Sequence, residues 1–468
     1  MILDSLHKIY FLGIGGIGMS ALARYFLMKG CEIYGYDKTQ TELTKKLESE
    51  GMNIHYGEAD MALIPDMLDL VVWTPAIPKD FEELVFFQNS GIPLKKRAEV
   101  LGIISRSQRT IAVAGTHGKT TTSTLVTHLL RTGGVDCTAF LGGISENLGS
   151  NYAGGQSDWV VAEADEYDRS FLHLSPEVAI LLSMDPDHLD IYGEAAAVAE
   201  TGFKEFLKKT KPNGKVFINQ NLVQNIDNQL FEINGSAWEP SNKPRLHTFG
   251  IGAGEYRAEH VRVEDGWFVF DLKTPLPEQG MEAIRFAMPG RHNVENAVAA
   301  IAVALQLGIG ETAIREAMLN FKGIKRRFEL VHRDDRTVFI DDYAHHPTEI
   351  KAAVQAAREL FPGRKITGIF QPHLYSRTRD FQDGFATELD QLNEILLMDI
   401  YPAREKPIPG VTSDIIFDKM KNPNKMLVTK ENVLNALKSK QLDVVMTIGA
   451  GDIDTVVGPI KAYLMVNG

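Results

Sequence analysis

The stretch TIAVAGTHGKTTTSTLVTHLLRTGG, residues 110–134, decides how the centre of this chain folds. Its β-branched apolar start predicts a buried strand, and the residues from Lys119 onward predict a helix that ends at Gly133 and Gly134. The loop between them offers backbone N–H groups and one ammonium to phosphate groups. This arrangement is typical of a P-loop, in which Lys119 contacts the β- and γ-phosphates and the Thr120 hydroxyl binds magnesium. The predicted nucleotide-binding residues of the loop are Gly115, Thr116, His117, Gly118, Lys119, Thr120 and Thr121.

Acidic residues follow the next two predicted strands along the chain. The strand WVVAE ends at Glu163, and the strand VAILLS is followed by a cluster of three aspartates around His188. Magnesium bound to a triphosphate needs hard oxygen ligands besides the loop hydroxyl, and these usually come from the carboxyl ends of neighbouring parallel strands. The sequence therefore predicts a metal site beside the P-loop, with Glu163 and the cluster around His188 as candidates. An imidazole there can bind the metal or orient a substrate carboxylate.

Apolar β-rich runs alternate with helical patterns along most of the chain, which predicts an α/β protein with parallel sheets covered on both faces. A length of 468 residues corresponds to about three domains. Composition changes near 105–110 and 321–328 place these domains at 1–107, 108–324 and 325–468. Within the second, the stretch from about 245 to 290 lacks long helices and predicts a small antiparallel sheet.

A second glycine-rich loop lies near the N-terminus. The strand KIYFLGI runs into Gly13, Gly15 and Gly18, and the next strand ends at Asp37. This spacing suits a diphosphate at a helix N-terminus, with Asp37 accepting a hydrogen bond from a ribose hydroxyl. Such a loop recognises diphosphates in general, so the spacing alone leaves both a nicotinamide dinucleotide and other nucleotides open.

Charge and cysteine content exclude several classes of protein. The net charge is -12, with 49 basic and 61 acidic residues and no long run of one sign. This balance argues against binding to nucleic acid or to an anionic membrane. Two cysteines give no disulfide framework and suit the cytoplasm. The first residues lack the basic region of a signal peptide, and no apolar run approaches the roughly 18 residues of a membrane span.

A series of motifs resembles the Mur ligases of peptidoglycan synthesis over essentially the whole chain. The motifs are GTHGKTTT, EADEYD, DPDHLDIYG, GRHNVENA, RRFE, DDYAHHP and FQPHLYSRTRDF, in this order. The last two, with PIPG at 407–410 and GAGDI at 449–453, resemble the family member that uses a single amino acid. The resemblance implies ATP-dependent ligation of L-alanine to UDP-N-acetylmuramate through an acyl phosphate.

The resemblance also implies a role for each domain. An N-terminal Rossmann-like domain would bind the UDP-sugar, a central P-loop ATPase domain would bind ATP, and a C-terminal Rossmann-like domain would bind the amino acid. The first glycine loop would then face the UDP diphosphate. Because acyl phosphates hydrolyse readily, we expect the domains to close over the reactants, with hinges near residues 107 and 324.

Individual site residues follow from the same resemblance, and the implied cofactors are ATP and Mg²⁺. Lys119, Glu163 and His188 would be catalytic. Thr120, Glu163 and His188 would bind the metal. The remaining implied contacts are Asn293 and Asn296 for adenine, Arg327 and Asp342 for the ATP phosphate and ribose, Gly13, Gly15, Gly16, Gly18 and Asp37 for the UDP-sugar, and Tyr343, His345, His373 and Arg377 for alanine. Ser183 stands where the family usually has asparagine, and Leu374 where it commonly has arginine.

Three other functions remain open. A recycling ligase that attaches a preformed tripeptide to the same UDP-sugar shares the ATPase motifs, but a pocket of histidine and arginine better suits a small carboxylate. A nicotinamide-dependent dehydrogenase would explain Gly13 to Gly18 and Asp37 but not the P-loop. A noncatalytic ATP-binding switch would need the P-loop but not the C-terminal motifs. His345, His373 and a bound phosphate oxygen are the candidate bases for the alanine ammonium.

Overall fold

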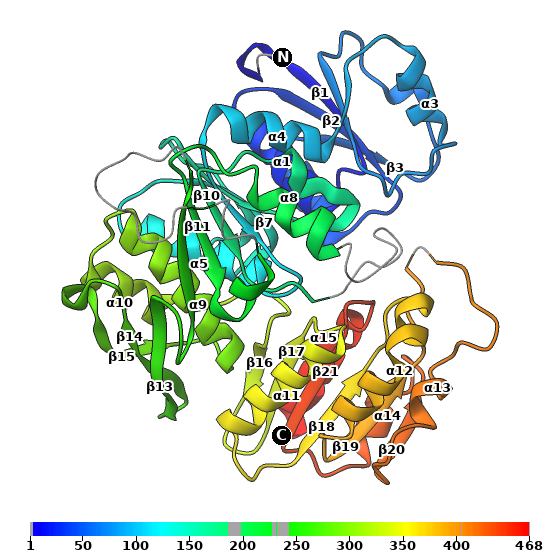
Figure 1. The fold of residues 1–468 in the computed structure, drawn as a ribbon. Helices are drawn as coiled ribbons and strands as arrows, with labels where there is room; N and C mark the ends of the chain where they lie inside the picture. The colour runs from blue at the N-terminus through cyan, green and yellow to red at the C-terminus, as the bar shows by residue number, and fades with distance from the viewer. Residues whose placement is uncertain (1–2, 186–197, 227–230, 232–242, 404, 468) are drawn as a thin grey trace. The chain divides into compact units, whose positions relative to one another are not determined.

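The computed structural model describes residues 3–185, 198–226, 231, 243–403 and 405–467. Three β-sheets carry helices on their faces, so the predicted α/β class is confirmed (Figure 1). The chain forms two compact units, which are described separately. The first unit contains residues 1–259, 272–282 and 295–320, and the second contains 260–271, 283–294 and 321–468. The predicted three-domain limits remain a prediction.

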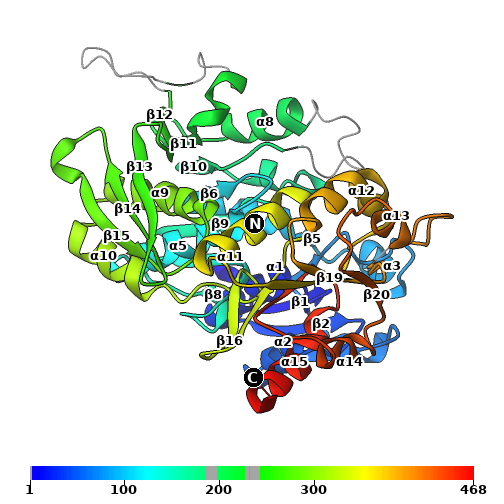
Figure 2. The ribbon, with the colours of Figure 1, turned by 90° about the horizontal axis from the view of Figure 1, so that it is seen from below.

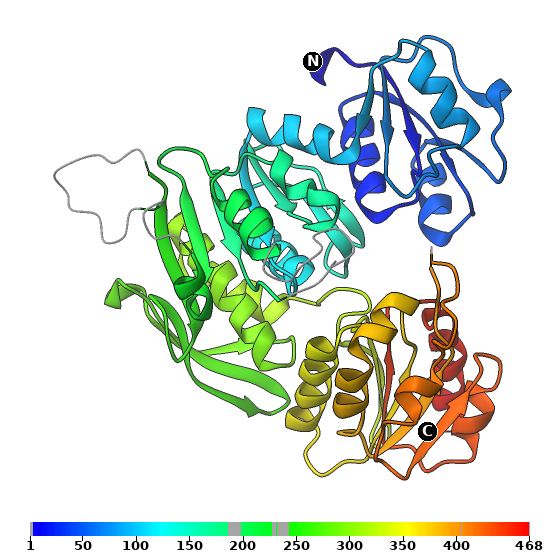
Figure 3. The same cartoon turned by 45° about the vertical axis from the view of Figure 1, so that its right-hand side comes forward.

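The N-terminal sheet has five parallel strands in the order β3-β2-β1-β4-β5. On β1, Ile9 and Phe11 join the core formed with α1 and α4, whereas Tyr10 and Leu12 face the core formed with α3. Helices therefore cover both faces, as expected of a Rossmann-like sheet (Figure 3). The elements are β1 (Lys8–Leu12), α1 (Ile17–Met28), β2 (Glu32–Asp37), α2 (Glu42–Ser49), β3 (Asn53–Tyr56), β4 (Leu70–Trp73), α3 (Glu82–Asn89), β5 (Leu94–Lys96) and α4 (Arg97–Ser107).

The central sheet has ten strands in the order β15-β14-β13-β12-β11-β10-β6-β9-β7-β8. β6 pairs in parallel with both β9 and β10, which places the ends of these three strands at one edge. The stretch predicted as a small sheet forms β12 to β15 and extends this larger sheet. Asp265 and Gly266 both have positive φ between β13 and β14, as in a tight hairpin turn. The strands are β6 (Arg109–Ala114), β7 (Thr138–Ser145), β8 (Ser150–Ala153), β9 (Trp159–Glu163), β10 (Val178–Leu181), β11 (Lys215–Asn219), β12 (Arg245–Ile251), β13 (Tyr256–Glu264), β14 (Trp267–Lys273) and β15 (Met281–Phe286), and the helices are α5 (Lys119–Thr132), α8 (Lys204–Leu207), α9 (Arg291–Gln306) and α10 (Glu311–Asn320).

A buried polar contact joins the N-terminal sheet to the central sheet. Asn151 on β8 is completely buried, and its side-chain amide donates to the carbonyl of Ile17 at the start of α1. Its oxygen accepts from Arg24, whose guanidinium also binds both carboxylate oxygens of Glu50. The apolar core is continuous between the same two sheets. A hinge near residue 107 would have to break these contacts.

The C-terminal sheet has six strands in the order β16-β17-β21-β18-β19-β20, and only β16 is antiparallel to its neighbour. α11 and α12 pack side by side over one face (Figure 2), and α14 and α15 cover the other. This doubly covered sheet is Rossmann-like, as predicted. The elements are β16 (Glu329–Arg333), β17 (Val338–Asp342), α11 (Pro347–Leu360), β18 (Ile366–Phe370), α12 (Tyr375–Leu389), β19 (Glu394–Met398), α13 (Asp414–Phe417), β20 (Lys425–Val428), α14 (Val433–Lys438), β21 (Val444–Ile448) and α15 (Asp454–Asn467).

Among the described residues, no helix combines the length and the apolar character needed to cross a membrane.

Candidate active site

The P-loop connects β6 to α5 through two glycines whose replacement would strain the backbone and crowd its neighbours. Gly115 has φ +142° and Gly118 has φ +83°, which L side chains rarely adopt. A Cβ atom on Gly118 would lie 2.6 Å from Oδ1 of Asn296, and one on Gly115 would lie 2.9 Å from the backbone nitrogen of Ser183. The loop therefore turns tightly into α5, whose first N–H groups have no partner within the helix and can bind phosphate.

The ammonium of Lys119 is bound inside this loop. Nζ donates to the carbonyl oxygens of Gly115 at 2.8 Å and Thr116 at 3.3 Å, and to the two carboxylate oxygens of Glu166 at 2.9 and 2.7 Å. Burial by itself would lower the pKa of Lys119, but the carboxylates of Glu166, Asp165 and Glu163 outweigh it and raise the pKa. Lys119 is therefore charged. The sequence placed Glu166 among the acids that follow Glu163 but did not predict its contact with Lys119.

The other P-loop residues are held by the segment that follows β10. The backbone N–H of His117 donates to the Ser183 hydroxyl at 2.9 Å, and the Thr116 hydroxyl donates to the carbonyl of Asp185 at 2.8 Å. His117 also lies 3.5 Å from the Asp185 carboxylate, measured between Nε2 and Oδ2. Ser183, at the position where an asparagine is usual, thus holds the loop through its hydroxyl.

Glu163 is the last residue of β9 and lies opposite Val113 in the parallel pairing of β9 with β6. Because the P-loop follows β6, Glu163 lies at the same edge of the sheet as the P-loop. Its Oε2 accepts a hydrogen bond from the backbone N–H of Gly142 at 3.1 Å. A Cβ on Gly142 would lie only 2.2 Å from this oxygen, so a glycine is needed for the contact. The P-loop and a carboxylate suited to a hard metal ion therefore meet at one edge.

The predicted metal site is only partly within the described residues. Thr120 and Glu163 are described, whereas His188 and the aspartates at 187 and 190 lie outside the described residues. No group of three histidine, cysteine or acidic side chains suited to a metal ion occurs in the part of the chain that the structure describes. The metal-binding role of Thr120, Glu163 and His188 therefore remains a prediction.

A cavity of about 560 Å³ lies between the N-terminal sheet and the central sheet. One side is formed by the first glycine loop, and the opposite part of the lining comes from the end of β9 and from β7. A single molecule can therefore contact both the glycine loop and Glu163. The polar and glycine residues of the lining include Gly13, Gly15, Gly16, Gly18, Asp37, Lys38, Lys96, Arg97, Gly142, Glu163, Asp165 and Ser170.

The carboxylate of Asp37 binds the backbone of the first glycine loop. Its Oδ2 accepts a hydrogen bond from the backbone N–H of Gly15 at 2.8 Å, and a Cβ on Gly15 would lie 2.8 Å from the same oxygen. Gly13 has φ +86°. Asp37 lines the cavity, and its Oδ2 atom is hydrogen-bonded to the loop. Its contact with a ribose hydroxyl remains a prediction.

Lys96 and Arg97 are candidate binding residues that sequence reasoning missed. They end β5 and begin α4, and both line the cavity beside the glycine loop. A Cβ on Gly18 would lie 3.0 Å from Nη1 of Arg97. The structure places Lys96 and Arg97 there because β5 is parallel to β4 and both strands end at the edge that carries the glycine loop. Two cations there suit an anionic ligand.

The two asparagines predicted to bind adenine lie in the first turns of α9, and both are buried. Asn296 packs against Gly118 of the P-loop. The side-chain amide of Asn293 donates to the carbonyl of Pro289 at 2.6 Å. The structure therefore places Asn296 next to the P-loop within the first unit.

In the second unit, the four residues predicted for the alanine site come together. Nη1 of Arg377 lies 3.3 Å from Nδ1 of His373, and the rings of His345 and His373 lie 6.0 Å apart. The rings of Tyr343 and His345 are in edge contact at 5.3 Å. Tyr401, which sequence reasoning missed, stacks on His373 at 5.8 Å. Arg377 is nearly buried and can pair with a small carboxylate.

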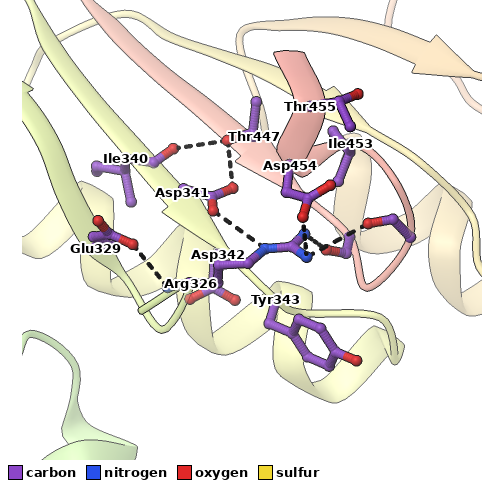
Figure 4. Close-up of polar contacts among 12 residues, drawn as sticks. Arg326, Glu329, Ile340, Asp341, Asp342, Tyr343, Thr447, Ile453, Asp454 and Thr455 are labelled. Atoms are coloured by element: carbon purple, nitrogen blue, oxygen red, sulfur yellow. Dashed lines mark hydrogen bonds and ion pairs between the residues drawn. The ribbon is translucent and has the colours of Figure 1, made fainter. Parts of the chain in front are cut away.

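Arg326, which precedes β16, binds the loop that follows β21 (Figure 4). Its guanidinium donates to the carbonyl of Gly449 at 2.6 Å and lies 3.3 Å from Asp341 and 3.7 Å from Asp454. Arg326 thus supports the fold. Arg327, the arginine predicted to bind phosphate, lies 5.1 Å from the centre of the Tyr343 ring.

Asp342 and His345 titrate far from their ordinary ranges. Burial raises the pKa of Asp342 to about 6, although Arg327 and the backbone N–H groups of Ala344 and Phe328 oppose the change. Burial lowers the pKa of His345 to about 4, against the opposing carboxylate of Glu349. At neutral pH the His345 imidazole is neutral and a weak base.

The low pKa of His345 predicts a loss of stability in acid. Between pH 6.5 and 4 the unfolded chain binds a proton on this histidine that the folded chain does not, so stability falls as pH falls through this window. The loss at pH 5 relative to pH 7.5 is up to about 2 kcal/mol, because 1.36 kcal/mol corresponds to one pKa unit. His345→Gln should lose less stability than the parent when urea unfolding is compared at the two pH values. Equal losses would show that His345 does not titrate in this way.

A P-loop at the edge of a parallel sheet, together with a glycine loop that shares a cavity with Glu163 at that edge, is typical of an α/β enzyme that acts on nucleotides. Three domain descriptions match the chain: the Mur ligase family catalytic domain at residues 8–109, the Mur ligase middle domain at 113–304, and the Mur ligase glutamate ligase domain at 326–451. The chain belongs to the Mur ligase family, which confirms the resemblance seen in the motifs.

Individual relatives match the full length of the chain. It is 48% identical over 471 residues to the UDP-N-acetylmuramate--L-alanine ligase of Flavobacterium johnsoniae, with 100% of both chains covered. The crystal structure of UDP-N-acetylmuramate-alanine ligase from Thermotoga maritima matches with a TM-score of 0.81 at 29% identity, covering 98% of this chain and 100% of that one. A murein peptide ligase from Psychrobacter arcticus shares the fold, with a TM-score of 0.68 at 23% identity and 98% of both chains covered.

Proposed function

We propose that this protein joins L-alanine to UDP-N-acetylmuramate in an ATP-dependent reaction of peptidoglycan synthesis, giving UDP-N-acetylmuramoyl-L-alanine, ADP and phosphate. The observation that carries the proposal is the cavity shared by the first glycine loop and Glu163. A nucleotide-sugar bound there by its diphosphate would direct its other end toward the edge that carries the P-loop. The full-length identity to an alanine-adding ligase supports this substrate.

The first step in this proposal activates a carboxylate. A carboxylate oxygen of the lactyl group attacks the γ-phosphorus of ATP, ADP leaves with the electrons of the broken P–O bond, and an acyl phosphate forms. Lys119 would stabilise the charge on the transferring phosphoryl group, because this chemistry depends mainly on positioning and electrostatics. Lys96 and Arg97 would hold the diphosphate of the sugar nucleotide together with the N–H groups of the glycine loop.

The second step forms the amide. The alanine amine attacks the acyl carbon, and the tetrahedral intermediate expels inorganic phosphate. Arg377 would bind the alanine carboxylate, with His373 beside it. The proton released from the amine would go to a phosphate oxygen or to His373, since the pKa of about 4 makes His345 a weaker acceptor at neutral pH.

Magnesium fits the oxygen donors at the edge of the central sheet. Thr120 and Glu163 would hold the ion through oxygen atoms, and His188, which lies outside the described residues, would add an imidazole nitrogen. Glu163 lines the cavity beside the first glycine loop. Hydroxyl and carboxylate oxygens are the donors that magnesium prefers. When bound, the ion supplies positive charge that stabilises the phosphate oxygens.

The proposed domain roles keep the predicted limits: residues 1–107 for the UDP-sugar, 108–324 for ATP and 325–468 for the amino acid. We also place the reaction in the cytoplasm. Both cysteines, Cys31 and Cys137, are buried free thiols, which suits a reducing compartment.

An ADP-release assay tests the proposed function. Turnover should require UDP-N-acetylmuramate, L-alanine and Mg²⁺ together, and mass spectrometry of the product should show the added alanine. Omission of any one component should reduce ADP release to background. Full-rate ADP release without L-alanine would contradict amide formation and would favour a simple ATPase.

Competition distinguishes the recycling ligase. When L-alanine and a preformed tripeptide are offered together, we expect the alanine product alone, because Arg377 beside His373, on which Tyr401 stacks, would pair with one small carboxylate. Predominance of the tripeptide product would favour the recycling reaction.

A further inference from the structure

Lys119 has no hydrogen-bond donor left for a nucleotide in this structure. An ammonium carries three N–H donors, and four acceptor oxygens lie within 3.3 Å of Nζ. Two of these are carbonyl oxygens of the loop itself, from Gly115 and Thr116. The other two belong to the Glu166 carboxylate, which is bound through both oxygens. A triphosphate can accept a hydrogen bond from Lys119 only if it displaces one of these oxygens, and the Glu166 carboxylate is the negatively charged partner that a phosphate would replace.

The ion pair between Lys119 and Glu166 is buried. The Glu166 side chain is 2% exposed and that of Lys119 is 13% exposed, so neither charge is well screened by water. Glu166 lies at the start of η3 (Tyr167–His173), three residues after Glu163, and Asp165 is between them in the chain. This acidic segment and the P-loop belong to the same compact unit.

We propose that Glu166 is a competing counter-ion for the P-loop lysine. In the empty enzyme its carboxylate occupies the place on Lys119 that the nucleotide phosphates take, and nucleotide binding exchanges the carboxylate for phosphate. Glu166 thereby keeps Lys119 folded onto the loop carbonyls and lowers the affinity for nucleotide. This inference rests on the proposed ATP site and adds to it a residue that sets nucleotide affinity.

The exchange leaves a buried carboxylate without its lysine, which is unfavourable unless positive charge replaces it. Glu166 would then lie near Glu163 and Asp165 in one acidic segment. A divalent cation that arrives with the nucleotide would offset this charge. The competition should therefore be strongest when nucleotide binds without metal.

Glu166→Gln tests the competition, because glutamine is nearly the same size and removes the charge. Isothermal titration with ADP in EDTA should show at least tenfold tighter binding to the variant than to the parent. Adding Mg²⁺ should strengthen ADP binding less in the variant than in the parent. Glu205→Gln is the matched control, because Glu205 is a partly exposed residue of the same unit paired with Lys208, and this variant should bind ADP like the parent.

The outcomes separate this inference from the proposed function. If the parent binds no ADP with or without Mg²⁺, the proposed ATP site is wrong. If the parent binds ADP but Glu166→Gln binds it equally or more weakly in EDTA, Glu166 does not compete and the inference is wrong. Should the glutamine variant fail to fold, Glu166→Asp serves instead: its shorter carboxylate should hold Lys119 less well and give ADP affinity above that of the parent, and unchanged affinity would overturn the inference.

Discussion

Replacing Lys119 with alanine should lower kcat for ADP release by at least about a thousandfold, a loss typical of removing the main electrostatic contact to a transferring phosphoryl group. The P-loop geometry supports this size of effect, because the carbonyls of Gly115 and Thr116 hold Nζ within the loop that would surround the phosphates. The KM for L-alanine should change little, since the residues proposed to bind alanine belong to the other compact unit. Steady-state kinetics with each substrate varied in turn measures both effects.

The control for this prediction must account for Glu166. Removing Lys119 takes the ammonium away from the 2% exposed carboxylate of Glu166, and breaking a buried ion pair in this way costs about 3–5 kcal/mol. The single variant should therefore melt at a lower temperature. Lys119→Ala combined with Glu166→Gln should recover thermal stability but not activity. Recovered activity in the double variant, or a single variant with more than a tenth of the parental kcat, would contradict the role of Lys119.

Replacing Arg377 with alanine should raise the KM for L-alanine at least a hundredfold, equivalent to about 3 kcal/mol for losing a buried charge-assisted contact. Arg377 is nearly buried and lies against His373, where its guanidinium can pair with the amino-acid carboxylate. The KM for ATP should remain within about twofold of the parent. Arg377→Lys should recover only part of the loss, because an ammonium cannot bind a carboxylate in the planar bidentate manner of a guanidinium.

Arg379 offers a matched control for Arg377 on the same helix. Its side chain is about half exposed and pairs with its neighbour Asp380. Arg379→Ala removes the same charge from α12 and should leave the KM for L-alanine unchanged. A comparable rise of KM in both variants would show that the effect comes from the helix or its overall charge and not from binding at Arg377.

Much of the fold was predictable because it depends on local patterns. The P-loop is a strand, a glycine turn and a helix contiguous in the chain, and the positive φ of Gly115 and Gly118 explains why glycines stand there. The alternation of strands and helices predicted the parallel sheets at both ends of the chain. The stretch from 245 to 290 was predicted as a small antiparallel sheet, and the prediction did not include that β12 and β13 join its strands to the central sheet. Edge pairing between sheets is a long-range property that hydrophobic periodicity does not report.

The site was predictable where its residues lie in contiguous motifs. Tyr343, His345, His373 and Arg377 were predicted from two motifs, and the structure brings all four together. Tyr401 was missed because it reaches His373 from a different loop, after β19. Lys96 and Arg97 were missed because nearly 80 residues separate them from the glycine loop that they accompany.

Local sequence was sufficient for the phosphate loops, the alternation of strands and helices, and the class of reaction that they serve, because backbone conformation and hydrophobic period depend on neighbours in the chain. Tertiary structure alone decided which of the clustered acids meets Lys119. The sequence gives no reason to assign different contacts to the neighbouring acids Glu163, Asp165 and Glu166. In the structure, Glu163 accepts a hydrogen bond from the backbone N–H of Gly142, whereas Glu166 binds the ammonium of Lys119. Coulomb attraction and desolvation depend on distance and burial, and both are set only when β9, β6 and α5 pack together.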